Sequence, residues 1–211
     1  MMIRLLTRIA LIVLLATMGR TTLADALVAD LSEHLVKIDL GFTGKQVLLY
    51  GAIEGEGNVV VVVQGPRKPI TMRRKARVAG VWANDASVTF NDAISFYQVM
   101  ASAELDEWLP FTLRERHQIG VEYLDFSPRE EIGPAEKADF QTALIRSKQN
   151  LGHYGMLEGR VSVLGGRLFR TEIFFPANVP TGIYNLEAFL VRDGEMISAQ
   201  KTPLYVSKSG I

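Results

Sequence analysis

The strongest constraint on the fold of this chain is a run of five consecutive valines at positions 59–63. β-Branched side chains are stiff about χ1 and pack well on a pleated surface, so the run predicts a β-strand over residues 58–64. Successive side chains of a strand point to opposite faces, so five apolar residues in a row place apolar groups on both faces. We therefore predict that both faces of this strand are covered, as in the centre of a β-sandwich.

The residues around the valine run alternate between short apolar segments and turn residues. Residues 46–52 form such a segment before the run, and Gly55-Glu56-Gly57 separates the two. Further short strands are predicted at 34–40, 69–74, 77–83, 86–90 and 94–100. About seven short strands with turns between them are typical of an immunoglobulin-like sandwich, which we predict for residues 27–102.

Residues 103–151 change in character and are predicted to form a helical connector. The clearest helix covers residues 134–150, and its buried face at the 3.6-residue spacing comprises Phe140, Ala143, Leu144, Ser147 and Leu151. A shorter helix is predicted at 110–118, where Pro110 suits a first turn. Ser127 followed by Glu130 has the order of a capping box, which predicts a further helix start.

A period of two returns in residues 152–211 and predicts a second β-sandwich unit. Hairpins are predicted at Gly165-Gly166 and at Asp193-Gly194. Residues 180–184 resemble the start of a late strand in immunoglobulin-like sandwiches, where a tyrosine hydroxyl, here that of Tyr184, pins the corner. The predicted fold class is therefore mainly β, with immunoglobulin-like β-sandwich units joined by a short helical connector. The sequence leaves open whether the two β parts form one core or two.

The first 26 residues have the layout of a secretory signal peptide. Arg4 and Arg8 precede an uncharged apolar run at 9–18, and small residues follow at 22–26. Ten apolar residues are too few to cross a hydrocarbon core that needs about 20. We therefore expect residues 1–26 to be a signal peptide and the rest to work outside the cytoplasm, with an uncleaved anchor as the alternative.

Composition excludes several classes of function. The chain has no cysteine, which excludes disulfides, zinc–thiolate sites and thiol nucleophiles. Residues 1–26 contain three arginines and one aspartate, so removing them changes the balanced net charge to −2. That balance argues against a nucleic-acid partner. No second apolar stretch approaches membrane-spanning length, so the mature chain is expected to be soluble.

Nothing in the sequence supports catalysis. The three histidines, His34, His117 and His153, lack metal-ligand spacing, and no known catalytic or nucleotide-binding motif is present. We therefore expect no enzyme activity, no metal and no cofactor. An enzyme stays a third alternative, which would require a pocket that brings one of these histidines within hydrogen-bond reach of a carboxylate.

Residues 67–77 are densely basic and contain no acid. The six cations are Arg67, Lys68, Arg73, Arg74, Lys75 and Arg77. One interpretation is that this basic segment faces the acids of residues 103–131; another is a solvated edge strand, whose lysines discourage strand addition. The third is a docking surface for an anionic partner, a lipid headgroup or a small oxyanion, which arginine's planar fork suits. Trp82 nearby is interpreted first as a core residue and second as a ligand platform.

Two segments, residues 73–84 (RRKARVAGVWAN) and 168–194, together with Phe90 and residues 95–97 (SFY), resemble a known family. It is the alphaproteobacterial transmembrane protein family of unknown function. The resemblance implies a signal peptide, a periplasmic β-rich region and one C-terminal transmembrane helix. It also implies an accessory role at the inner membrane, beside a permease of the sulfite-exporter type. The matching positions have no established role in the family; they are Arg73, Arg74, Lys75, Arg77, Gly80, Trp82 and Asn84.

This chain departs from the family pattern because it ends at Ile211, where members usually continue into the membrane helix. It is therefore expected to be either truncated or soluble in the periplasm. The leading hypothesis is a non-enzymatic periplasmic interaction module, an accessory protein of a membrane transporter. Its expected interaction surface comprises Arg73, Arg74, Lys75, Arg77, Trp82 and Asn84. The alternative is a periplasmic binder of a small anion such as a sulfur oxyanion or a carboxylate.

Overall fold

The computed structural model describes residues 26–78, 80–156 and 158–209, without the side chains of Val78 and Trp82. The predicted signal peptide, apart from Ala26, lies outside the described residues. The chain is mainly β, as predicted, and the helices of the described residues all lie within 105–150.

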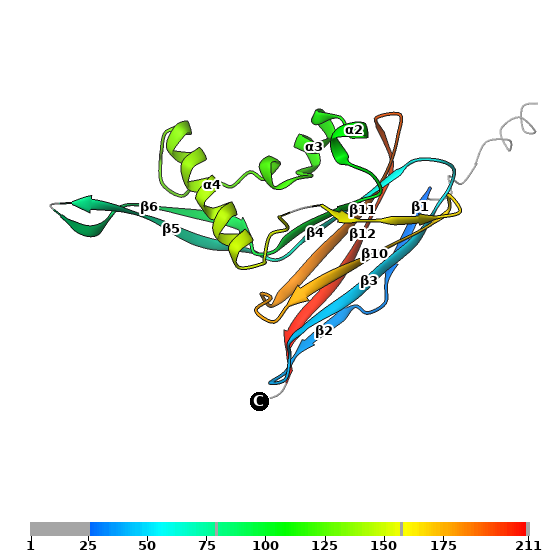
Figure 1. Cartoon of the computed structure of the whole chain (residues 1–211), viewed down its shortest axis with the longest axis horizontal. Helices are drawn as coiled ribbons and strands as arrows, with labels where there is room; N and C mark the ends of the chain where they lie inside the picture. The colour runs from blue at the N-terminus through cyan, green and yellow to red at the C-terminus, as the bar shows by residue number, and fades with distance from the viewer. Residues whose placement is uncertain (1–25, 79, 157, 210–211) are drawn as a thin grey trace, which may run out of the picture.

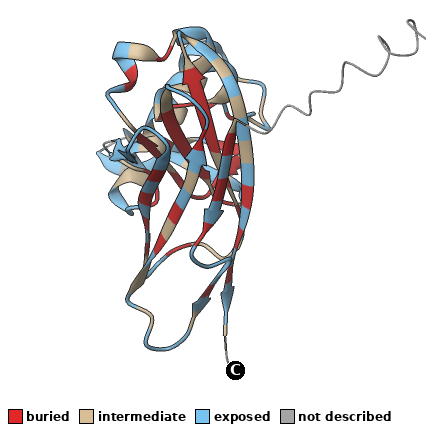
Figure 2. Cartoon of the chain, turned by 90° about the vertical axis from the view of Figure 1, so that its right-hand side faces the viewer, coloured by how far each residue is buried: buried red, intermediate tan, exposed pale blue. Residues whose placement is uncertain are grey.

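Two curled sheets pack on a shared core, and we call this two-sheet body the sandwich (Figure 1). The four-stranded sheet has the order β1 (Leu27–Leu31), β3 (Gly44–Ile53), β10 (Leu168–Pro176) and β9 (Ser162–Leu164). The six-stranded sheet has the order β2 (Leu35–Ile38), β12 (Glu195–Lys208), β11 (Gly182–Arg192), β4 (Asn58–Gln64), β7 (Tyr97–Ala101) and β8 (Gly159–Arg160). Pairing is antiparallel except for β2 with β12 and β7 with β8. Figure 2 shows buried and exposed residues alternating along the strands, as expected where one face of a sheet packs on a core.

The valine run forms β4, and the prediction that both its faces are covered is confirmed. Val59, Val61 and Val63 lie in the core between the two sheets, while Val60 and Val62 lie in a second core on the other side of the six-stranded sheet. All five are at most 1 % exposed. Strand β4 is therefore the shared wall of two hydrophobic cores.

The two β parts of the sequence are interleaved in the same sheets. Strand β3 pairs with β10 over nine residues, and β4 lies between β7 and β11. The core between the sheets accordingly contains residues from both ends of the chain, such as Leu49 and Leu186. The two β parts therefore share the core between the sheets and do not form a separate core each.

The helical segment covers the outer face of the six-stranded sheet. It contains α2 (Leu105–Trp108), α3 (Phe111–His117), the 3-10 turn η1 (Val121–Tyr123) and α4 (Pro134–Asn150). Helix α4 has the predicted bounds and buries Phe140 and Leu144 in the second core. Its predicted face is too wide, because Ser147 and Leu151 are exposed.

The helix start predicted at Ser127 is wrong. Residues 127–130 instead run beside β6 (Val81–Ile94), where Arg129 N–H donates to Thr89 O at 2.7 Å. The Glu130 carboxylate accepts a 2.8 Å hydrogen bond from Thr89 N–H, which lowers the pKa of Glu130. The Glu130 carboxylate therefore accepts a hydrogen bond from β6 and not from the backbone N–H of Ser127, as a capping box would require.

A long β-hairpin projects from the sandwich, and we call it the arm. It consists of β5 (Arg67–Val78) and β6, which pair antiparallel from Arg67–Ile94 out to Val78–Val81, with register shifts after Lys68 and after Arg74. Figure 1 shows α4 alongside its base and its distal part extending beyond the helix. The separate strands predicted at 69–74, 77–83 and 86–90 are thus wrong. Residues 77–83 contain the reversal of the hairpin, where Gly80 adopts φ +87°, a left-handed conformation that favours glycine.

Tyr184 pins a corner of β11, as predicted. Its buried hydroxyl donates a 2.6 Å hydrogen bond to Pro180 O, four residues earlier. Its ring packs edge-on against Phe175 and Phe96 at centroid distances of 5.5 and 5.6 Å. Burial raises the pKa of this phenol.

We expect Tyr184→Phe to lower the free energy of unfolding by about 1 kcal/mol, because Pro180 O loses its partner while the ring packing stays. Urea denaturation measures the change. Tyr205→Phe, at a half-exposed position on β12, is the matched control and should leave stability unchanged. Equal stability of Tyr184→Phe and the native chain would contradict the corner's role.

We expect Val61→Thr and Val62→Thr each to destabilise the fold by about 1–3 kcal/mol, because each buries a hydroxyl in one of the two cores. Val28→Thr, at a position on β1 that is 54 % exposed, should change little. Denaturant titrations compare the three variants. A loss of stability at only one of the two buried positions would show that only one face of β4 is covered.

Candidate functional site

The outer face of the arm carries three cations in a row. Arg73, Lys75 and Arg77 occupy alternate positions of β5, so their side chains share one face. All three are exposed, and within the described residues none has a carboxylate oxygen within 4.0 Å. We call these three residues the cationic face.

The cationic face is a row of unneutralised charge. Alternate residues of a strand are about 7 Å apart, so neighbouring cations repel by about 0.6 kcal/mol even in water. Arg77 Nε donates a 3.2 Å hydrogen bond to Gly80 O, which orients the guanidinium but leaves its charge unbalanced. An anionic surface placed against this face would relieve the repulsion.

Arg74 lies on the opposite face of β5 and is already engaged. Its Nε lies 3.2 and 3.3 Å from the two carboxylate oxygens of Asp85, and its Nη2 lies 4.0 Å from Glu136 on α4. Its guanidinium also lies 5.7 Å from the centre of the Phe140 ring. The sequence grouped Arg74 with its neighbours, but strand alternation separates them.

The cations at the base of the arm contact the body of the protein. Arg67 Nη1 lies 3.7 Å from Asp92, and Lys68 Nζ donates to Thr181 O at 3.3 Å. They are therefore not part of the cationic face.

The acidic residues of segment 103–131 do not neutralise the arm. Arg114, which is buried, pairs with Asp106 and, at 2.7 Å, with Glu122. Lys137 pairs with Asp125 at 2.8 Å. Within the described part of the chain, no ion pair links the basic segment to an acid of residues 103–131. The interpretation that the basic segment faces these acids is therefore wrong.

The remaining predicted surface residues, Trp82 and Asn84, lie on β6, and each is the cross-strand neighbour of a cation of the cationic face. In the register of the hairpin Asn84 faces Lys75 and Trp82 faces Arg77, while Ser87 faces Arg73. Asn84 and Ser87 are exposed. The Trp82 side chain lies outside the described part, so its two alternative interpretations stay predictions.

A groove of about 270 Å³ lies between the arm and α4. The arm contributes four residues, Met72 to Lys75, and α4 contributes Asp139, Phe140, Ala143 and Arg146. Arg146 is exposed and has no carboxylate oxygen within 4.0 Å among the described residues. Sequence reasoning missed the α4 wall, although positions 139, 143 and 146 have the spacing of one helix face.

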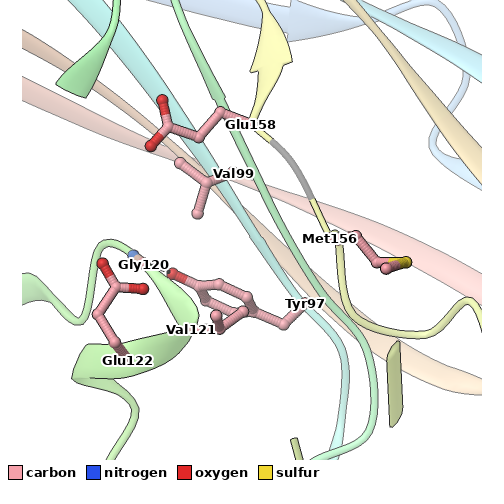
Figure 3. A pocket seen from close by; sticks show the side chains of 8 residues that line it. Tyr97, Val99, Gly120, Val121, Glu122, Met156 and Glu158 are labelled. Atoms are coloured by element: carbon pink, nitrogen blue, oxygen red, sulfur yellow. Dashed lines mark hydrogen bonds between the residues drawn. The ribbon is translucent and has the colours of Figure 1, made fainter. Parts of the chain in front are cut away.

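A smaller pocket of about 120 Å³ surrounds Tyr97 (Figure 3). Glu122 and Glu158 point into the pocket from two segments, with the Tyr97 ring below Val99. The Tyr97 hydroxyl donates to Gln118 O at 2.5 Å and accepts from Gly120 N–H at 2.8 Å. Burial raises the pKa of Tyr97 and that of Glu158. Because both hydrogen bonds of the phenol are used within the fold, Tyr97 has a structural role in this pocket.

The three histidines lie apart from one another. His34 Nε2 lies 3.2 Å from Asp30, but both side chains are about half exposed and neither lines one of the pockets described above. His153 Nε2 lies 3.0 Å from Asn178 O, and burial lowers its pKa. The His117 ring packs 5.4 Å from that of Phe189. Among residues 26–78, 80–156 and 158–209, no group of three His, Asp or Glu side chains could hold a metal ion.

Comparison with known proteins confirms the resemblance found in the sequence. No curated protein is detectably similar to the chain. Within the described ranges, no helix has the length and apolar character that crossing a bilayer requires. A family model described as "Putative transmembrane protein (Alph_Pro_TM)" matches residues 26–211. The chain therefore belongs to the Alph_Pro_TM family.

Proposed function

We propose that the chain is a non-enzymatic interaction module outside the cytoplasm, an accessory protein of a membrane transporter that it contacts through the arm. The observation that carries this proposal is the cationic face, three exposed cations without a carboxylate partner within the described residues. The arm's length and its projection beyond α4 give that face access to a partner that the sandwich itself does not touch (Figure 1).

The proposed partner presents an acidic surface. Arginine's fork forms paired hydrogen bonds with carboxylates, and Lys75 between the two arginines adds a mobile point charge. Asn84 and Ser87, the cross-strand neighbours of Lys75 and Arg73, add neutral hydrogen-bonding groups. Charge pairing of this kind speeds association and weakens as salt rises.

The proposed location is the periplasmic side of the inner membrane. The signal-peptide layout of residues 1–26 supports export, and the family description supports a place at the membrane. A sulfite-exporter-type permease is the proposed partner on the strength of the family resemblance alone. We also propose that the sandwich is immunoglobulin-like, supported by its two facing sheets and the Tyr184 corner.

A second candidate function, binding of a small anion, is favoured by a separate observation. The groove between the arm and α4 is lined by four cations and one carboxylate. The groove shares Arg73 and Lys75 with the cationic face, whereas Ala143 and Arg146 on α4 line the groove alone. Substitutions on α4 therefore test the groove without changing the cationic face.

We expect the triple variant Arg73→Glu, Lys75→Glu and Arg77→Glu to lose association with its membrane partner. Each change replaces attraction with repulsion at the proposed contact, so we predict a loss of about tenfold or more. Co-purification from solubilised native membranes, quantified by mass spectrometry at low and high salt, measures the loss.

The matched control changes three exposed cations of the sandwich, Lys37, Arg170 and Lys208, to glutamate. It alters the net charge by the same amount and should keep the partner. Both triple variants should keep the native melting temperature, because none of the six residues forms an ion pair within the described part. Equal recovery of the partner with the arm variant and the control would contradict the proposal.

A further inference from the structure

We propose that the groove between β5 and α4 binds a small amphipathic anion: a carboxylate, sulfonate or phosphonate carried on a short apolar body. This inference deepens the second candidate function and rests on it, because it assigns the ligand class of that groove. The groove shares Arg73 and Lys75 with the cationic face, so the variants that test it change residues of α4 only.

The floor of the groove is apolar. Phe140 is 4 % exposed, and Met72 and Ala143 beside it are half-buried. A bare inorganic anion gains nothing from such a floor, whereas a hydrocarbon or aromatic body gains free energy by covering it. The volume, about 270 Å³, is several times the roughly 30 Å³ of one water and lies near the lower end of small-ligand sites.

The charged groups lie at the rims, on two different elements. Arg146 comes from α4, and Arg73 and Lys75 come from β5. None of the three has a carboxylate oxygen within 4.0 Å in the described structure, so an anion would not have to displace an existing ion pair. A charged head group can therefore bind at the rim while the apolar body lies on Phe140.

The arm is built so that Arg74 is held in place at this groove. The register of the hairpin shifts between Arg74, opposite Ala86, and Lys75, opposite Asn84, which leaves Asp85 as the extra residue of a β-bulge. The Asp85 carboxylate holds Arg74 Nε, and the guanidinium lies over the Phe140 ring. Because Asp85 balances Arg74, and Asp139 adds one negative charge, the lining favours a ligand of low charge over a polyanion.

The test is an NMR titration of the full chain with three probes. Benzenesulfonate has both the charge and the apolar body, inorganic sulfate has only the charge, and benzenesulfonamide has nearly the same shape without the charge. We expect benzenesulfonate to bind about tenfold more tightly than either of the others. The amide shifts should cluster at residues 72–75 and 139–146.

Two variants locate the site. Arg146→Gln removes a rim charge, and Ala143→Leu fills the floor while leaving every charge in place. Each should weaken benzenesulfonate binding by about tenfold. Arg116→Gln, an exposed cation on α3 outside the groove, is the matched control and should bind as the native chain does.

The outcomes distinguish the location of the site, the class of its ligand and the anion-binding function. Benzenesulfonate binding that Arg146→Gln and Ala143→Leu leave unchanged would overturn the assignment to this groove. Sulfate binding as tight as benzenesulfonate binding, and lost in Arg146→Gln, would overturn the amphipathic ligand while the anion-binding function stands. Failure of all three probes to bind would overturn both. The docking proposal is unaffected, because neither variant changes the cationic face.

Discussion

The two-sided burial of β4 is the constraint on which the rest of the structure depends. Its valines are divided between the core inside the sandwich and the core beneath the helices. The second core also contains Val88, Phe90 and Ile94 of β6, so the root of the arm is fixed by the same packing. A two-stranded hairpin is only marginally stable in water, and burial of its root allows a long arm to persist. The direction of the cationic face therefore follows from the packing around β4.

The distribution of charge gives the arm its proposed role. The acids of the helical segment serve local contacts: Asp106 and Glu122 balance the buried Arg114, and Glu130 accepts a hydrogen bond from the backbone of β6. Few acids are thus left to balance the arm, and Asp85 and Glu136 both engage Arg74. Neutralising Arg73, Lys75 and Arg77 inside the molecule would have been simple for a chain with 23 acidic residues. That they are left exposed supports an external partner.

Local patterns in the sequence predicted local structure well. The valine run, the bounds of α4, the two late hairpins and the Tyr184 corner each depend on residues close together in the chain. Long-range features were missed, because a period of two fixes neither the length of a strand nor its partner. Two examples are the pairing of β3 with β10 and the long arm, which the sequence predicted as three separate short strands. The groove was missed for the same reason, since Arg146 and Arg74 meet only through the packing of α4 on β5.

Site-specific photo-crosslinking in native membranes tests the central claim most directly. A photoreactive residue in place of Lys75 reports on the cationic face, and the same residue in place of Arg170 reports on the outer face of the sandwich. We predict that position 75 forms an adduct with one polytopic membrane protein and that position 170 does not. Adducts of position 75 with lipid alone, or the same adducts from both positions, would contradict the docking of the arm on a membrane transporter.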